Sequence, residues 1–234
     1  MSLEYDYFIA GGGSAGCVLA SRLANKSKDS ICLVEAGGSG KNLFIKMPAG
    51  NGFIFGNPKF DWGYHSVKQA QLNNRKIYFA RGKGLGGTSI VNGMVYIRGV
   101  AQDYDNWRQM GLDGWGYSDL LPYFKYSEGS TNRQKKFHGN QGPLKVEPAR
   151  NFSVLDEAFI KAAVETGHEF LDDFNANKRA GVSRIDSTTF RGVRQSSAIS
   201  YLKKVPKNLK ILTNTRLVKI LFKNNKAVGS QTID

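Results

Sequence analysis

Two glycine-rich segments contain the residues of this chain that are best suited to bind a ligand. In the first, Gly11, Gly13 and Gly16 form a G-x-G-x-x-G pattern directly after the apolar run at residues 5–10. In this pattern the first glycine permits a tight turn, the second lets the backbone approach a pyrophosphate, and the third lets a helix pack close to a strand. The segment predicts a dinucleotide site at a helix N-terminus, where backbone N–H groups attract phosphates.

The elements around this loop support that interpretation. The β-branched and aromatic residues 5–10 predict a buried strand, and a helix over residues 15–26 and a second strand at 30–34 follow. Glu35 ends the second strand 19 residues after Gly16, where an acid that bonds a ribose hydroxyl is expected. An acid there disfavours NADP, whose 2′-phosphate would face a carboxylate. The alternative is a strand–helix–strand unit that binds no ligand.

The second segment, residues 81–94, contains five glycines at 82, 84, 86, 87 and 93 and shows no strand pattern. Ordering such a stretch costs much conformational entropy. This cost favours a segment whose backbone lies against a flat ligand over a plain linker. Thr88, Ser89 and Asn92 could bond a heteroaromatic ring or phosphates. A flexible surface loop is the alternative.

Residues 82–92 read GKGLGGTSIVN, and Tyr96, Gly99 and Asp105 follow them at the spacing of a known signature. In these positions the chain resembles the glucose–methanol–choline flavoprotein oxidoreductases, nearest to their choline and alcohol dehydrogenase branch. The resemblance extends from about Tyr5 to the last residue. Further stretches similar to the family are 34–38, 61–64, 138–144 and 194–198.

The resemblance implies an α/β fold: a Rossmann-like FAD-binding domain with an attached β-meander and a partial substrate-binding domain. Residues 1–140 and 191–234 would belong to the FAD-binding domain, the latter as the meander part, and residues 141–190 would begin the substrate-binding domain. Within this frame we expect helices at 102–110, 117–126, 154–166 and 196–202, a polar mobile loop at 130–140, and strands at 144–147, 209–212, 217–222 and 227–233. The last three strands would form the meander.

The resemblance also implies FAD as the cofactor and assigns its contacts by position. Ser14 and Ala15 match positions that meet the pyrophosphate, and Glu35 matches the adenosine ribose ligand. Second-loop positions match contacts to the flavin and its ribityl-phosphate arm, and the backbone of Val218 matches the position that faces the adenine. The expected FAD-binding residues are Gly11, Gly13, Ser14, Ala15, Gly16, Glu35, Ala36, Gly86, Gly87, Thr88, Asn92, Gly93, Met94, Val95 and Val218.

Some choline oxidases of this family carry a histidine, covalently bonded to the flavin, at the position of Val91. Valine has no nucleophile, so non-covalent FAD is expected here.

The implied reaction is hydride transfer from the CH–OH group of an alcohol, choline-like or another primary alcohol, to N5 of the flavin. In this family the base is a histidine near the C-terminus of a much longer chain, so no catalytic residue is assigned and residues 1–234 alone are expected to be inactive. The three histidines have structural interpretations: His65 as a packing or surface residue, His138 in a turn motif, and His168 at a helix end.

Composition sets further bounds. The chain is 41% hydrophobic and 12% aromatic, as in globular proteins, and no apolar run approaches the ~18–20 residues of a membrane span. The N-terminus shows no secretory pattern, and Cys17 and Cys32 suit free thiols in a cytoplasmic protein. The net charge of +14 raises nucleic acid as a partner, but no binding motif accompanies it. The cysteines and histidines do not show the spacing of metal ligands, so no metal site is expected. The chain could form a homo-oligomer.

Two other functions compete with this one. A complete NAD-binding dehydrogenase would explain the first loop but not residues 81–94. A non-catalytic or split flavin-binding module would explain both loops and the lack of a base. The sequence does not name the alcohol, nor choose between oxygen and a quinone or dye as electron acceptor.

Overall fold

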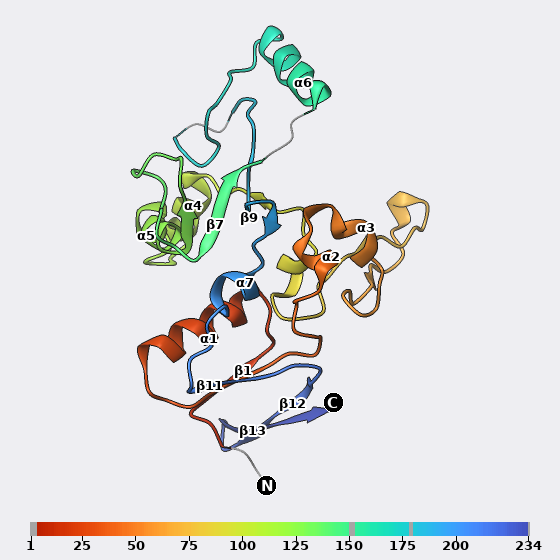
Figure 1. Cartoon of the computed structure of the whole chain (residues 1–234), viewed down its shortest axis with the longest axis vertical. Coiled ribbons are helices and arrows are strands. Elements are labelled where there is room, and N and C mark those ends of the chain that lie inside the picture. Colours follow the sequence, from red (N-terminus) through yellow and green to blue (C-terminus); the bar gives the residue numbers. More distant parts are fainter. Residues whose placement is uncertain (1–3, 150–152, 178–179, 234) are drawn as a thin grey trace. The chain divides into compact units, whose positions relative to one another are not determined.

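The computed structural model describes residues 4–149, 153–177 and 180–233, and the chain divides into two compact units (Figure 1). The first unit comprises Met1–Gly93 and Gly192–Asp234, and the second comprises Met94–Arg191. This division is geometric. The expected assignment of residues 1–140 and 191–234 to FAD binding and of 141–190 to substrate binding stays a prediction.

A three-stranded parallel sheet is the centre of the first unit, with strand order β1-β2-β11. Its strands are β1 (Tyr7–Ala10), β2 (Ile31–Val34) and β11 (Leu209–Leu212), and Leu33 of β2 lies opposite both Ile9 and Ile211. Helix α1 (Ser14–Lys26) connects β1 to β2 and packs against the sheet. Its buried residues are small (Cys17, Ala20, Ser21, Ala24), as a close helix–strand approach requires. The predicted strand–helix–strand unit is therefore confirmed. The expectation that its first strand is buried is wrong, because β1 lies at the edge of this sheet and only Ile9 of its residues is buried.

The expected three-stranded meander over residues 209–233 is wrong in its first strand. Strand β11 pairs parallel with β2, and only β12 (Arg216–Lys223) and β13 (Lys226–Ile233) form an antiparallel pair. The reason is burial: Leu209 joins the apolar cluster that contains Ile31 and Leu33, so β11 gains more from the core than from the exposed hairpin. The hairpin turns at Asn224 and Asn225, both with positive φ, as a tight two-residue turn favours.

A second apolar cluster in the first unit supports the later glycine-rich segment. It consists of Ile45, Ile54, Phe60, Ile90 and Val91, all buried. The short elements of this region are α2 (Leu43–Lys46), η1 (Pro48–Gly50), α3 (Asn51–Ile54), β3 (Tyr64–His65), η2 (Ala70–Leu72), β4 (Tyr78–Phe79), η3 (Gly87–Ile90), β10 (Val193–Arg194) and α7 (Ser197–Tyr201). Helix α7 packs against α1.

The second unit contains a four-stranded sheet of order β5-β8-β7-β6, in which only β6 and β7 are parallel. The predicted helices are confirmed with small shifts at their ends. The elements are β5 (Val95–Tyr96), α4 (Ala101–Gln109), α5 (Tyr117–Ser127), β6 (Glu128–Ser130), β7 (Leu144–Pro148), α6 (Val154–Glu165), β8 (Asp186–Ser187) and β9 (Thr189–Phe190).

The segment 130–140 is anchored at both ends, which corrects the expectation of a mobile surface loop: Ser130 is buried in β6, and its N–H donates to the carbonyl of Gly139 at 2.9 Å. Phe137 and His138 are buried, and the imidazole of His138 lies between two carboxylates: Nδ1 is 2.7 Å from Glu128 and Nε2 is 2.8 Å from Asp173. Glu128 also pairs with Arg98. Polar composition predicted exposure, but these charged groups compensate one another and can be buried together.

Three properties of the described part of the chain bear on the other expectations. None of its helices combines the length and the apolar character needed to cross a bilayer. Cys17 and Cys32 are buried free thiols. Within the same described residues, no three His, Cys, Asp or Glu side chains are grouped so that they could hold a metal ion.

Candidate cofactor-binding site

The two glycine-rich segments identified in the sequence contact each other. The N–H of Gly86 donates to the carbonyl of Gly12 at 2.7 Å, and the Ser14 hydroxyl donates to the carbonyl of Gly86 at 3.4 Å. A Cβ on Gly87, whose φ is +53°, would lie 2.7 Å from Cα of Gly13, so no larger residue fits there without a backbone shift. The segments thus form one surface of the first unit.

The turn after β2 joins the same surface. The N–H of Leu85 donates to the carbonyl of Gly38 at 2.9 Å, and a Cβ on Gly37 would lie 2.4 Å from the backbone of Lys83 and Gly84. Three backbone turns therefore meet at the carboxyl ends of β1 and β2. Ligands of open parallel sheets bind outside the carboxyl ends of the strands.

The first loop is packed on one side and open on the other. A Cβ on Gly16 would lie 2.0 Å from the carbonyl oxygen of Gly11, which explains the third glycine of the pattern. A Cβ on Gly13 would meet no described atom within 4 Å, and the same holds for Gly11. The first turn of α1, which begins at Ser14 and includes Ala15, contains no acidic residue. This open backbone at a helix N-terminus fits a pyrophosphate.

Glu35 is buried and clamps two of the turns. One carboxylate oxygen accepts the N–H of Gly12 at 2.9 Å, and the other accepts the N–H of Gly37 at 2.8 Å. A carboxylate oxygen can accept more than one hydrogen bond, so a ribose hydroxyl remains compatible with these contacts. The structure adds a role that the sequence did not indicate, because Glu35 also organises the loop; its contact with ribose stays a prediction. Ala36 follows it, half-buried.

The polar residues of the second segment are held in place by the protein itself. The Thr88 carbonyl accepts the N–H of Asn92 at 2.9 Å. The Ser89 hydroxyl donates to the carbonyl of Gly86 at 2.6 Å and accepts the N–H of Ser197 at 2.9 Å. Ser89 is therefore a structural residue here. The side chains of Thr88 and Asn92 also accept hydrogen bonds from the protein, from Gly82 and Arg194, and their contacts with a cofactor stay predictions. Gly93 has open space around its Cα, as far as the described atoms show.

Arg194 is a residue of this region whose contacts the sequence analysis did not foresee. Its side chain is fully buried in the first unit, and it donates to the Asn92 carbonyl at 2.6 Å and to the Asn92 amide oxygen at 2.9 Å. Burial lowers the pKa of Arg194 to about 10, so the guanidinium stays protonated at neutral pH. The only sequence signal was its place in the family-like stretch 194–198, which does not indicate burial.

Three expected residues belong to other elements than the two glycine-rich segments and the turn after β2. Met94 and Val95 belong to the second unit; Met94 has a φ of +63°, and its carbonyl accepts the N–H of Thr188 at 2.8 Å. Val218 lies in β12 at a β-bulge, since the pairing passes from Leu217 to Lys219, and it is exposed. Their contacts with a cofactor stay predictions.

The histidines are dispersed. His65 is exposed in β3, with Nδ1 3.0 Å from the carbonyl of Gly63, and His168 is exposed after α6. His138 is buried between Glu128 and Asp173, and both ring nitrogens are engaged. Burial lowers the pKa of His138, but its hydrogen bonds and the charges of these two carboxylates outweigh burial and raise it to about 9. An imidazole that is protonated at neutral pH is a poor base there.

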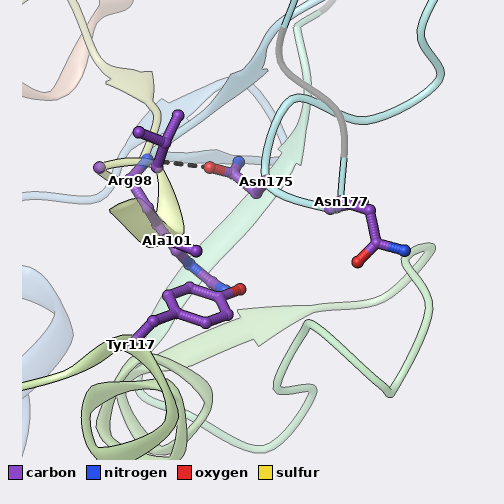
Figure 2. Close-up of a pocket in the computed structure, with 8 residues that line it drawn as sticks. Arg98, Ala101, Tyr117, Asn175 and Asn177 are labelled. Atoms are coloured by element: carbon purple, nitrogen blue, oxygen red, sulfur yellow. Dashed lines mark hydrogen bonds between the residues drawn. The ribbon is translucent and has the colours of Figure 1, made fainter. Parts of the chain in front are cut away.

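The second unit contains a cavity of about 160 Å³. Figure 2 shows Arg98, Ala101, Tyr117, Asn175 and Asn177 at its wall, and the N–H of Arg98 donates to the amide oxygen of Asn175 at 2.9 Å. The other lining residues are Gly99, Val100 and Ala176. None of the expected FAD-binding residues lines this cavity.

The comparison with known families agrees with the resemblance seen in the sequence. Residues 5–234 match the N-terminal family model described as GMC oxidoreductase, and the chain belongs to this family. It is 41% identical over 232 residues to an oxygen-dependent choline dehydrogenase of Sinorhizobium fredii, an alignment that covers 97% of this chain and 42% of that protein. The chain thus spans less than half the length of this curated relative.

Solved structures give the same fold. Pyridoxine 4-oxidase from Mesorbium loti superposes with a TM-score of 0.93 and 32% identity, covering 98% of this chain and 46% of that one. An FAD-dependent oxidoreductase from Chaetomium thermophilum superposes with a TM-score of 0.90 and 31% identity, covering 98% and 42%. The α/β, Rossmann-like fold class is confirmed, and a complete NAD-binding dehydrogenase is not supported.

Proposed function

We propose that this chain is the FAD-binding part of an FAD-dependent oxidoreductase that acts on the CH–OH group of an alcohol. The observation that carries the proposal is the contact of the two glycine-rich segments through Gly86 and Gly12, beside the open backbone of Gly13. The FAD-dependent relative of similar fold supports the same cofactor.

The residues present fit this cofactor. The backbone of Gly11 and Gly13 and the N-terminus of α1 would hold the pyrophosphate, and Glu35 would hold the adenosine ribose. Thr88 and Asn92, fixed by their own backbone contacts, would orient the flavin end. When bound, FAD supplies a hydride acceptor for the carbon that carries the hydroxyl group.

The attachment of FAD is proposed to be non-covalent. Val91 has no nucleophile, and its side chain is buried in the apolar cluster with Ile45, Ile54, Phe60 and Ile90. A side chain directed into this cluster cannot bond the cofactor.

The substrate is proposed to be a choline-like or other primary alcohol, because the relatives include a choline dehydrogenase and a pyridoxine oxidase. Oxygen and a quinone or dye remain the two candidate electron acceptors.

The catalytic base is proposed to lie outside these residues. Both ring nitrogens of His138 contact carboxylates, of Glu128 and Asp173, and the other two histidines are exposed. A cytoplasmic location is proposed from the free thiols of Cys17 and Cys32.

Titration of the purified chain with FAD tests the proposal, with NAD as the comparison ligand. We expect FAD to bind and NAD to bind at least tenfold more weakly. Alcohol-dependent dye reduction by the FAD-loaded chain then distinguishes the parts of the proposal: we expect none from residues 1–234 and turnover from the full-length parent. A parent that binds FAD but oxidises no alcohol would favour a non-catalytic flavin-binding module.

A further inference from the structure

Arg194 ties three separate segments of the first unit together. Its Nε donates to the carbonyl of Ile45 at the end of α2 at 2.9 Å, and Nη2 donates to the amide oxygen of Asn51 at the start of α3 at 2.6 Å. Nη1 donates to both oxygens of Asn92. The guanidinium thus uses its planar fork of donors to hold the segment that follows η3.

The charge of Arg194 is not neutralised within the described residues. Its hydrogen-bond acceptors are backbone carbonyls and side-chain amides, and no described carboxylate forms an ion pair with it. Arg98, which is also buried, pairs with Glu128, and the half-buried Arg133 pairs with Asp186. A buried cation without an anionic partner is costly. An anionic group from outside the chain would offset that cost.

The same contact fixes the orientation of the Asn92 amide. Arginine only donates hydrogen bonds, so the atom of Asn92 that faces Nη1 must be the oxygen. The amide nitrogen, a donor, then lies at the other end of the group. The contact therefore places the positive charge of Arg194, which no described carboxylate pairs, beside Asn92, one of the expected cofactor contacts.

We propose that Arg194 is a positioning residue that makes the cofactor site favour the reduced, negatively charged form of the flavin. This inference rests on the proposed function. Gain of a hydride adds one negative charge to the flavin ring, whereas the phosphates of FAD carry the same charge in both forms. The ratio of the dissociation constants for oxidised and reduced FAD therefore isolates the effect of positive charge near the ring from phosphate binding.

Anaerobic titration of the chain with oxidised and with photochemically reduced FAD measures this ratio. We expect the wild-type chain to bind reduced FAD more tightly. Arg194→Gln removes the charge and should lower the ratio about tenfold, which corresponds to a midpoint potential about 30 mV more negative for a two-electron couple. Arg194→Lys keeps the charge but not the fork, so it should bind both forms more weakly and retain most of the ratio.

Asn51→Asp separates the charge of Arg194 from its packing. The aspartate has the same shape, keeps the acceptor for Nη2, and adds the carboxylate that Arg194 lacks. It gives up one long contact, in which the amide nitrogen of Asn51 donates to the Asn92 carbonyl at 3.5 Å. We expect this variant to be folded, to have an unchanged or higher melting temperature, and to lose the preference for reduced FAD. The matched control is Asn42→Asp, at the N-cap of α2, where the side chain accepts the N–H of Phe44 and an aspartate caps equally well.

The outcomes are distinguishable even if Arg194→Gln does not fold. A wild-type chain that binds neither form of FAD overturns the proposed function and this inference with it. A wild-type chain that binds both forms equally, or an Asn51→Asp variant that keeps the wild-type ratio, overturns the inference alone. A ratio lowered in Asn51→Asp and unchanged in Asn42→Asp supports it, because a purely structural arginine would not produce that difference.

Discussion

The N–H of Gly86 donates a 2.7 Å hydrogen bond to the carbonyl of Gly12 and so joins two loops that are distant in the sequence. Gly86 has a φ of +103°, a backbone conformation that L side chains rarely adopt. Beside this contact the backbone of Gly13 is open, and the loops together present the surface to which we assign FAD.

Substitution by alanine should have different effects on stability and FAD binding at Gly13 and at Gly16. Gly13 has a φ of −70° and open space at its Cβ position, so Gly13→Ala should leave the free energy of unfolding unchanged or raise it by about 0.4–1 kcal/mol. It should weaken FAD binding at least tenfold, or about 1.4 kcal/mol, because the methyl group occupies the cofactor side. Urea denaturation and FAD titration measure the two effects.

Gly16→Ala serves as the comparison. Its methyl group would lie 2.0 Å from the carbonyl oxygen of Gly11, so the helix must shift away from the strand. We expect the free energy of unfolding to fall by about 1–3 kcal/mol without any ligand present. If Gly13→Ala destabilises the apoprotein as much as Gly16→Ala does, the open side of the loop is misassigned.

Glu35→Ala should affect both the apoprotein and the complex. Removal of the carboxylate leaves the N–H groups of Gly12 and Gly37 without their acceptor, which should lower the free energy of unfolding by about 1–3 kcal/mol. If Glu35 also bonds the adenosine ribose, the affinity for FAD should fall by more than the affinity for a flavin without adenosine. Titration with FAD and with FMN, which lacks the adenosine, makes the comparison; equal losses would contradict the ribose contact.

His138 should make the stability of the second unit depend on pH. Its pKa is about 9 in the folded protein against 6.5 for an ordinary histidine, because Asp173 and Glu128 hold the protonated form despite burial. The folded state therefore binds the proton more tightly, and its stabilising effect is complete below pH 6.5 and is lost as the pH rises through 9.

His138→Gln removes this contribution. We expect a loss of about 1–3 kcal/mol in the free energy of unfolding at pH 6 and a much smaller loss above pH 9.5. Urea denaturation across this pH range gives the comparison, and His168→Gln, at an exposed histidine, should keep the wild-type slope. A wild-type profile that is flat between pH 6 and 9.5 would show that the Glu128–His138–Asp173 contacts do not hold an extra proton.

FAD bound to this protein should be released by acid. Val91 lies in the apolar cluster and offers no nucleophile, so trichloroacetic acid precipitation should leave FAD in the supernatant. Flavin absorbance retained in the washed pellet would identify a covalent link through another residue.

Sequence patterns alone are enough to predict the local elements and the two glycine-rich loops. Strands β1 and β2, helix α1 and the helices α4, α5 and α6 follow from apolar spacing and from glycine placement, which are properties of neighbouring residues. The same holds for Gly11, Gly13 and Gly16, because their pattern directly encodes a turn, an open backbone and a close helix approach.

Contacts between residues that are distant in the sequence follow from the folded chain and not from local patterns. Leu209–Leu212 was predicted as a strand, but its parallel pairing with β2 depends on which apolar surface it can bury, and that surface comes from a distant part of the chain. His138 and Arg194 were assigned no buried role, since a charged side chain read alone is expected at the surface. Their burial becomes favourable only when Glu128 and Asp173, or the oxygens of Asn51 and Asn92, are folded against them.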